Sequence, residues 1–155
     1  MILMSKCLAG FPCRYDGKSK AVPVLKELYE SGEAVLVCPE QLGGLPTPRI
    51  PSEKKGDRVV NAAGEDVTEA FERGARAALA ICREKGCEMA ILKAKSPSCG
   101  KGLIHNGLFD GGYVPGDGVF AALLRKEGVR VLTEEEAYFA LRYRRGECTK
   151  WASKD

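Results

Sequence analysis

The chain has 155 residues, 45% of them hydrophobic, which suits a single domain with an ordinary core. Its 24 basic and 21 acidic residues give a net charge of +3 without a basic block, so a dedicated nucleic-acid-binding protein is not indicated. The apolar run at residues 1–4 is too short for a signal peptide, and no longer run could span a bilayer, so we expect a cytoplasmic protein.

Four short apolar runs without alternation predict strands that are buried on both faces. They cover residues 2–5, 34–37, 89–93 and 129–132, and helical patterns separate or follow them at 22–29, 67–85, 118–127 and 134–145. Strand and helix alternate, which favours a parallel sheet with right-handed crossovers. The sequence therefore predicts an α/β fold, a three-layer sandwich with a mainly parallel, Rossmann-like sheet. We expect one domain over residues 1–145 and a C-terminal tail over 146–155.

Capping signals mark the starts of two of these helices. Asp66 with Glu69 and Thr133 with Glu136 have the spacing of capping boxes. The helix at 22–29 requires Pro23 to lie in its first turn, where proline is tolerated. These residues fix the expected helix starts.

Two long irregular segments, residues 38–65 and 94–117, interrupt the alternation, and such loops are usually functional. The second predicts a hairpin around Asn106 and Gly107, with His105 as a solvated hairpin residue. Asp117 has the position of an N-cap for the helix that follows.

Seven cysteines are an odd number, which excludes a complete disulfide framework and indicates a metal site or catalysis. Cys7, Cys38 and Cys99 each follow a predicted strand, and the carboxyl ends of parallel strands meet at the edge where such sheets bind ligands. Three thiols there can bind Zn²⁺ or an iron–sulfur cluster and leave one coordination position open for chemistry. Cys82 is expected in the core, and neither Cys87 nor Cys148 has a partner at metal-ligand spacing.

The neighbours of these cysteines suit a reaction. Glu40 can act as a general base, and Ser96 and Ser98 can donate hydrogen bonds to a substrate or to cluster sulfides. Cys13 is a second candidate for the first ligand, and otherwise we expect it to line the pocket. The basic residues of the same loops can face an anionic substrate, chiefly Arg14, Arg49 and Lys95.

Five segments in order resemble the bacterial thiouracil desulfidases, a family long known only as a domain of unknown function. They are SKCLAGFPCRYDGKSK, VCPEQLGGLPTPR, GDRVVNAAGEDVT, AILKAKSPSCGKG and VPGDGVFAALLRKEGV. The resemblance covers about residues 1–136. It departs from the family at Lys6, where a small residue is expected, and this lysine either alters the cluster entrance or points outward.

The resemblance implies a [4Fe-4S] cluster held by three cysteines, with its fourth iron free. The family removes sulfur from a thiolated pyrimidine, such as 4-thiouracil or its nucleotide; water replaces the sulfur and hydrosulfide leaves without net redox change. Carried over by motif, the ligands are Cys7, Cys38 and Cys99, the acid/base is Glu40, and the positioning hydroxyls are those of Ser96 and Ser98. The expected partner is a small molecule rather than a membrane or a nucleic acid.

Two other functions remain open at this point. In the first, Cys99 is a nucleophile for sulfur transfer without a cluster, activated by Lys95 or Lys101. In the second, the protein is a metal-bearing regulatory or RNA-binding module without turnover, with the basic tail RYRRGECTKW as its contact surface.

Overall fold

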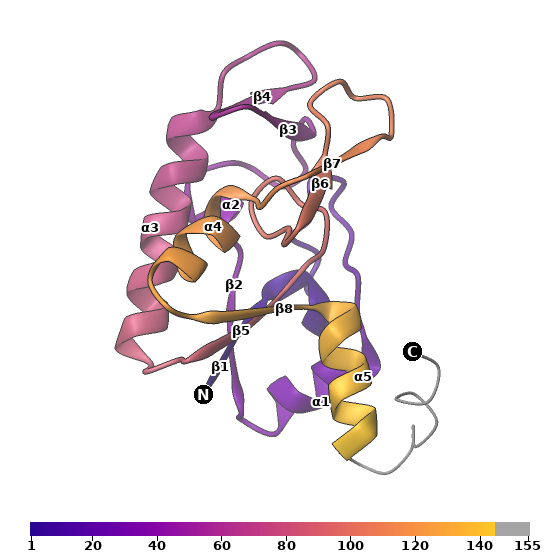
Figure 1. Cartoon of the computed structure of the whole chain (residues 1–155), viewed down its shortest axis with the longest axis vertical. Helices are drawn as coiled ribbons and strands as arrows, with labels where there is room; N and C mark the ends of the chain where they lie inside the picture. The colour runs from indigo at the N-terminus through magenta and orange to yellow at the C-terminus, as the bar shows by residue number, and fades with distance from the viewer. Residues whose placement is uncertain (145–155) are drawn as a thin grey trace.

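The computed structural model describes residues 1–144, and its centre is a four-stranded parallel sheet (Figure 1). The strands are β1 (Ile2–Ser5), β2 (Ala34–Val37), β5 (Met89–Leu92) and β8 (Arg130–Thr133), in the order β2-β1-β5-β8. Neighbouring strands are parallel throughout. The expected sheet is confirmed, with strand ends shifted by at most one residue. The predicted tail at 146–155 lies outside the described residues.

Helices cover both faces of this sheet, so the expected three layers are confirmed (Figure 1). α3 (Thr68–Glu84) and α4 (Val119–Lys126) pack on the face that carries Leu3 and Ala90. α1 (Pro23–Glu30) and α5 (Glu134–Arg144) pack on the face that carries Met4 and Ile91. Successive strand residues thus enter opposite cores, which is why the runs are apolar without alternation. Among the described helices, none combines the length and the apolar character that crossing a bilayer requires.

The helix starts follow the capping signals with one exception. Pro23 is the first residue of α1, and Thr133 and Glu136 exchange hydrogen bonds of 3.0 and 3.2 Å as a complete capping box. At the start of α3, the Asp66 carboxylate accepts a hydrogen bond from the N–H of Thr68 at 2.9 Å. The N-cap of α3 is Val67, however, and Glu69 pairs with Arg73 one turn later, so the capping box predicted for Asp66 and Glu69 is wrong.

Both long irregular segments contain a hairpin. The antiparallel pair β6 (Leu103–His105) and β7 (Tyr113–Pro115) is the predicted one, but its connection spans residues 106–112 instead of a tight turn. The Asn106 side chain causes this difference, because it accepts a hydrogen bond from the N–H of Leu108 and donates one to Asp110. The pair β3 (Ser52–Lys55) and β4 (Arg58–Asn61) was not predicted. Both hairpins lie beyond the carboxyl ends of the parallel strands (Figure 1).

A short helix, α2 (Pro39–Leu42), follows β2 and touches the backbone of α3. A Cβ atom added to Gly74 of α3 would lie 1.8 Å from the carbonyl oxygen of Pro39, and one added to Gly43 would lie 2.0 Å from that of Ala70. Only glycine permits this approach, because any side chain would force the two helices apart. The position of α2 is therefore fixed by α3.

We expect Gly74→Ala to lower the free energy of unfolding by about 2 kcal/mol, because the added methyl group overpacks the contact between α2 and α3. A glycine-to-alanine change at an exposed helix position would instead raise the free energy of unfolding, since alanine is the better helix former. Urea denaturation measures the effect, with exposed Arg76→Ala on the same helix as the control, for which we expect less than about 0.5 kcal/mol. A Gly74→Ala protein as stable as the wild type would contradict the contact.

Candidate functional site

A cavity of about 510 Å³ opens at the carboxyl edge of the sheet. Its walls come from the segment after β1, the start of α2, the loop after β5 and the two hairpins. All ten residues that the sequence singled out lie in these walls: Cys7, Cys13, Arg14, Cys38, Glu40, Arg49, Lys95, Ser96, Ser98 and Cys99. The topology thus brings together residues that are up to 92 positions apart in the chain, from Cys7 to Cys99.

Four thiols share this cavity. Cys7 lies in a 3-10 turn, η1 (Lys6–Ala9), directly after β1; Cys38 precedes α2. The Cys13 thiol is within hydrogen-bonding reach of both. Its hydrogen bond with Cys38 lowers the pKa of Cys13, but the Cys7 thiol and burial raise it more, to about 11. Cys38 donates to the Cys13 carbonyl oxygen at 3.8 Å, and its contact with Cys13 and its burial both raise the pKa of Cys38.

Cys99, the fourth thiol, is 6% exposed. Burial raises the pKa of Cys99 to about 12, although the neighbouring hydroxyls of Ser5 and Ser98 lower it. Of the two lysines that were expected to activate this thiol, Lys101 is paired with Glu136 and Lys95 lies over the ring of Tyr113, and neither bonds to Cys99 within residues 1–144. A protonated thiol is a poor nucleophile, so these contacts disfavour Cys99 as the attacking group of a cluster-free enzyme.

The donors in the cavity match an iron–sulfur cluster better than a single ion. Among residues 1–144, no three His, Cys, Asp or Glu side chains are grouped so that they could hold one metal ion. Thiolates are the usual ligands of iron–sulfur clusters, and four thiols line this one cavity, so the chemistry of the donors suits a cluster. In addition, Ser98 is 1% exposed and its Oγ has no hydrogen-bond partner in the described chain, which a bound group in the cavity would supply.

The turn that carries Cys99 is built around Ser96. The Ser96 hydroxyl oxygen accepts hydrogen bonds from the N–H groups of Ser98 and Cys99, at 3.1 and 3.0 Å. These two bonds fold residues 96–99 into a compact turn and leave the hydroxyl proton of Ser96 available. Ser96 therefore shapes the turn, whereas Ser98 has an unused hydroxyl.

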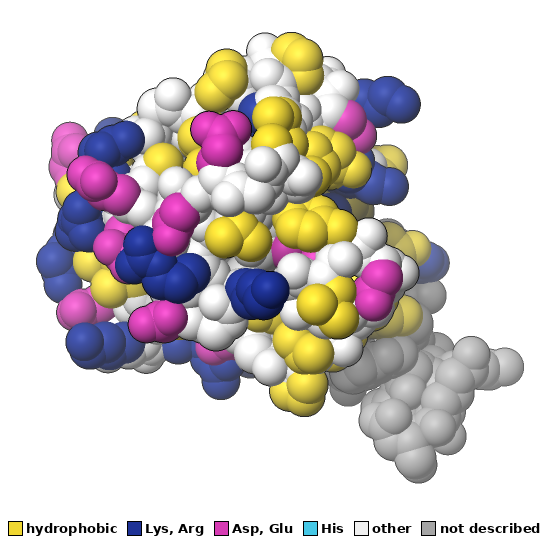
Figure 2. Space-filling model, turned by 90° about the horizontal axis from the view of Figure 1, so that it is seen from above, with side chains coloured by type: hydrophobic (Ala, Val, Ile, Leu, Met, Phe, Trp, Pro, Cys, Tyr) yellow, Lys and Arg dark blue, Asp and Glu magenta, His cyan; other side chains and the backbone are white. Residues whose placement is uncertain are grey.

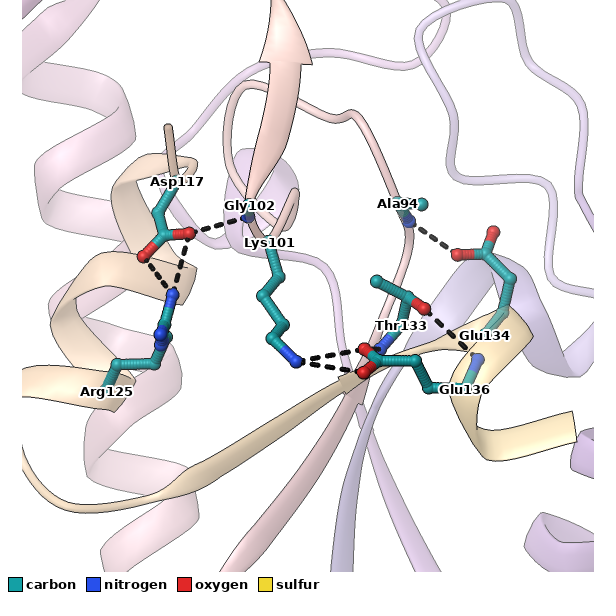
Figure 3. A network of polar contacts seen from close by, with 8 residues as sticks. All are labelled: Ala94, Lys101, Gly102, Asp117, Arg125, Thr133, Glu134 and Glu136. Atoms are coloured by element: carbon teal, nitrogen blue, oxygen red, sulfur yellow. Dashed lines mark hydrogen bonds and ion pairs between the residues drawn. The ribbon is translucent and has the colours of Figure 1, made fainter. Parts of the chain in front are cut away.

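Three carboxylates hold the ends of this loop (Figure 3). Glu134 accepts a hydrogen bond from the N–H of Ala94 at 2.6 Å, and Glu136 pairs with Lys101 at 3.0 Å. Asp117 accepts from the N–H of Gly102 at 2.8 Å and also pairs with Arg125. The expected N-cap at Asp117 is therefore wrong. Gly118 is the N-cap of α4, and the carboxylate of Asp117 fastens the loop instead.

Glu40 is paired with Arg49 in the cavity wall. The Glu40 Oε2 atom accepts from Arg49 Nε at 2.7 Å, and the two side chains are 15% and 7% exposed. The remaining guanidinium nitrogens donate to the carbonyl oxygens of Cys13 and Pro46 and to Thr47 Oγ1, at 3.0 to 3.1 Å. Arg49 was expected to contact substrate, but these contacts favour a role in positioning Glu40 and the Cys13 segment.

Two lysines of the cavity lie against aromatic rings, whereas a third, Lys93, pairs with Glu134 at 3.0 Å. Lys95 Nζ is 4.9 Å from the centre of the Tyr113 ring, and Lys6 Nζ is 5.5 Å from that of Phe11. Neither lysine has a carboxylate partner among the described residues, so both are available to an anionic ligand. Arg14 is less available, because it is 3.8 Å from Asp16.

Sequence reasoning placed His105 in the hairpin but did not foresee its place in the cavity wall. We expected it to be solvated; it is partly exposed, and it lines the cavity with its Nδ1 buried. The turn signals at Asn106 and Gly107 correctly predicted a hairpin, but they carry no information on which hairpin residues the rest of the fold covers. Cys82, by contrast, lies in the core as predicted, and it donates a hydrogen bond to the carbonyl oxygen of Cys87. Cys148 lies outside the described residues.

We expect Arg49→Gln to lower the free energy of unfolding by about 3 kcal/mol, because it leaves the Glu40 carboxylate buried without its partner. In a double-mutant cycle with Glu40→Gln, urea denaturation should give a coupling energy above about 1 kcal/mol. The exposed pair Arg83 and Glu127 is the control, with an expected coupling below that value. Equal coupling energies for the two pairs would contradict the prediction that burial strengthens the interaction between Arg49 and Glu40.

Comparisons with known proteins identify the family of this chain. The sequence pattern of the 2-thiouracil desulfurase family matches residues 2–136. A solved structure of the [4Fe-4S]-dependent thiouracil desulfidase TudS is 47% identical, with a TM-score of 0.85 over 92% of this chain and 96% of that one. The uncharacterized protein YbbK of Bacillus subtilis (strain 168) is 45% identical over 146 residues, 88% of this chain and 97% of YbbK. The chain belongs to the 2-thiouracil desulfurase family.

Proposed function

We propose that this protein is a [4Fe-4S]-dependent desulfidase that hydrolyses the carbon–sulfur bond of thiolated pyrimidines, 4-thiouracil or its nucleotide, and releases hydrosulfide. The observation that carries the proposal is the convergence of the strand-end thiols and Glu40 in one cavity. Membership of the desulfurase family and the likeness to TudS support it.

Cys7, Cys38 and Cys99 would hold the cluster, since each comes from a different strand end, and Cys13 would line the pocket beside them. When bound, the cluster supplies an open iron that acts as a Lewis acid with high affinity for sulfur. The chain itself must then bind the ring, provide a base for water and keep both in place.

Glu40 has the geometry of that base. Arg49 occupies its Oε2 atom, whereas Oε1 makes no hydrogen bond within residues 1–144 and can take a proton from water. The resulting hydroxide forms the new bond to the ring carbon that carries sulfur. The carbon–sulfur bond then breaks: sulfur keeps the electron pair of that bond, takes back the proton held by Glu40 and leaves as hydrosulfide, while the new ring hydroxyl loses its proton to solvent and becomes the carbonyl. No electron is gained or lost overall.

The serines and the cations of the cavity would hold the substrate. Ser98 Oγ is the buried hydroxyl without a partner in the described chain, and it can donate to the sulfur or to a ring oxygen. Lys95 and Lys6 can face the phosphate of a nucleotide substrate, since neither is neutralised by a described carboxylate. The free base would not use these two cations.

Hydrosulfide release from 4-thiouracil by the anaerobically reconstituted protein tests the reaction. We expect Glu40→Gln to lower kcat by about 10²- to 10⁴-fold, because the amide cannot accept the proton of water. Glu72→Gln, an exposed change on α3, should leave kcat unchanged. Wild-type turnover without loss in Glu40→Gln would rule out Glu40 as the base, and a loaded wild type that releases no hydrosulfide would refute the reaction.

Iron and acid-labile sulfide contents of single Cys→Ala variants test the ligand set. The variants at Cys7, Cys38 and Cys99 should lose the cluster or hold it weakly, and the wild type should bind about four irons and four sulfides. Cys13→Ala and the core control Cys82→Ala should bind as the wild type does. A cluster that survives in Cys7→Ala and is lost in Cys13→Ala would exchange the roles of the two thiols.

A further inference from the structure

The β6–β7 hairpin supplies a wall of the cavity that the proposed chemistry does not use. His105, Phe109 and Tyr113 all line the cavity, beside the turn that carries the serines. Figure 2 looks down on the end of the molecule where the hairpins lie, and hydrophobic side chains gather there. The outer side of the hairpin is apolar too, since Leu108 is 63% exposed and does not line the cavity.

A buried carboxylate fixes the tip of this hairpin. Glu53 of β3 is 8% exposed, and its Oε1 accepts hydrogen bonds from the N–H groups of Gly107 and Phe109, at 3.0 and 3.1 Å. Phe109 has a φ of +55° and Gly107 one of +85°, which turns both N–H groups toward the same oxygen. The loop at residues 106–112 is thus held against β3, and the wall beneath it is preformed.

His105 and Tyr113 face each other across the hairpin. They are register partners of β6 and β7, and their ring centres are 4.9 Å apart with an angle of 44° between the planes. On Tyr113 also lies Lys95, whose φ of 69° is rare for a residue other than glycine. Such backbone conformations are retained where they serve a site. The three residues form a continuous set of lysine, phenol and imidazole along the cavity.

The imidazole of His105 lacks a hydrogen-bond partner. Nδ1 is buried and unpaired, and neither ring nitrogen bonds to any residue in the described part of the chain. Because Nδ1 is buried, Nε2 is the nitrogen that a ligand in the cavity can reach. A polar group left without a partner in a cavity wall is a group that a ligand can satisfy.

The ligand that fits this wall is a flat ring with an amide edge. A pyrimidine offers an N–H donor next to a carbonyl acceptor, and a neutral imidazole can bond either of them. Lys95 and His105 each cover part of the Tyr113 ring, and Tyr113 is still 44% exposed, so the uncovered part of its ring can pack against a pyrimidine in the cavity. We infer that His105 is a specificity-determining residue that hydrogen-bonds the amide edge of the pyrimidine through Nε2, with Tyr113 as the stacking surface. This inference rests on the proposed function, because it names how the substrate of that site is held.

Binding of uracil, the product base, tests the inference without turnover. Equilibrium dialysis of labelled uracil against the cluster-free protein should give a Kd about 10-fold higher for His105→Phe, which keeps a ring but has no nitrogen. His105→Gln, which restores a donor and an acceptor, should recover part of the affinity. Leu108→Ala, on the same hairpin but outside the cavity, is the control and should bind like the wild type.

Kinetics of the loaded enzyme complete the test. His105→Phe should raise KM for 4-thiouracil about 10-fold and leave kcat within about 2-fold, the pattern of lost substrate binding. If the wild type and His105→Phe had the same Kd for uracil and the same KM for 4-thiouracil, the inference would be overturned. It would also be overturned if the wild type bound no uracil and His105→Phe left KM unchanged. A wild type that binds uracil through His105 but releases no hydrosulfide would refute the proposed function alone.

Discussion

One buried guanidinium organises the amino-terminal side of the cavity. Arg49 binds the carboxylate of Glu40 and the carbonyl oxygen of Cys13, and so joins α2 to the segment after β1. These two segments are far apart in the sequence, and only the parallel pairing of β1 with β2 brings them to one edge. An arginine buried to this extent must have its donors satisfied, and the chain satisfies them with groups of the site itself. The hydrogen bonds of Arg49 therefore both stabilise the fold and fix the geometry of the site.

The other side of the cavity depends on carboxylates in place of an arginine. Glu134, Glu136 and Asp117 fasten the loop that carries the serines and Cys99, and two of them belong to the first turn of α5 (Figure 3). The loop is therefore fixed by α5 and by the segment before α4, which pack on opposite faces of the sheet. Elements from both faces of the sheet thus hold the loop that carries Cys99.

Most of the fold followed from the sequence because its strands are buried on both faces and its helices carry capping signals. The cavity was also predictable, since cysteines after successive strands must meet at the carboxyl edge. The strand pair β3 and β4 was missed because Ser52–Lys55 is polar and short. Partner choice was unpredictable: no local pattern shows that Arg49 binds Glu40, or that Asp117 bonds Gly102. The place of His105 in the cavity wall likewise depends on what the rest of the chain places beside it.

The contact between Gly43 and Gly74 makes the position of Glu40 independent of the side chains in the hairpin wall. Backbone atoms make this contact, so it does not depend on what the cavity binds. Because it fixes α2, it also fixes the position of Glu40. Side chains in the hairpin wall can be exchanged to accommodate another ring while this glycine contact stays unchanged. A change in the hairpin wall would thus alter what the cavity accepts without moving α2, because the glycine contact holds α2 to α3 independently of the hairpins.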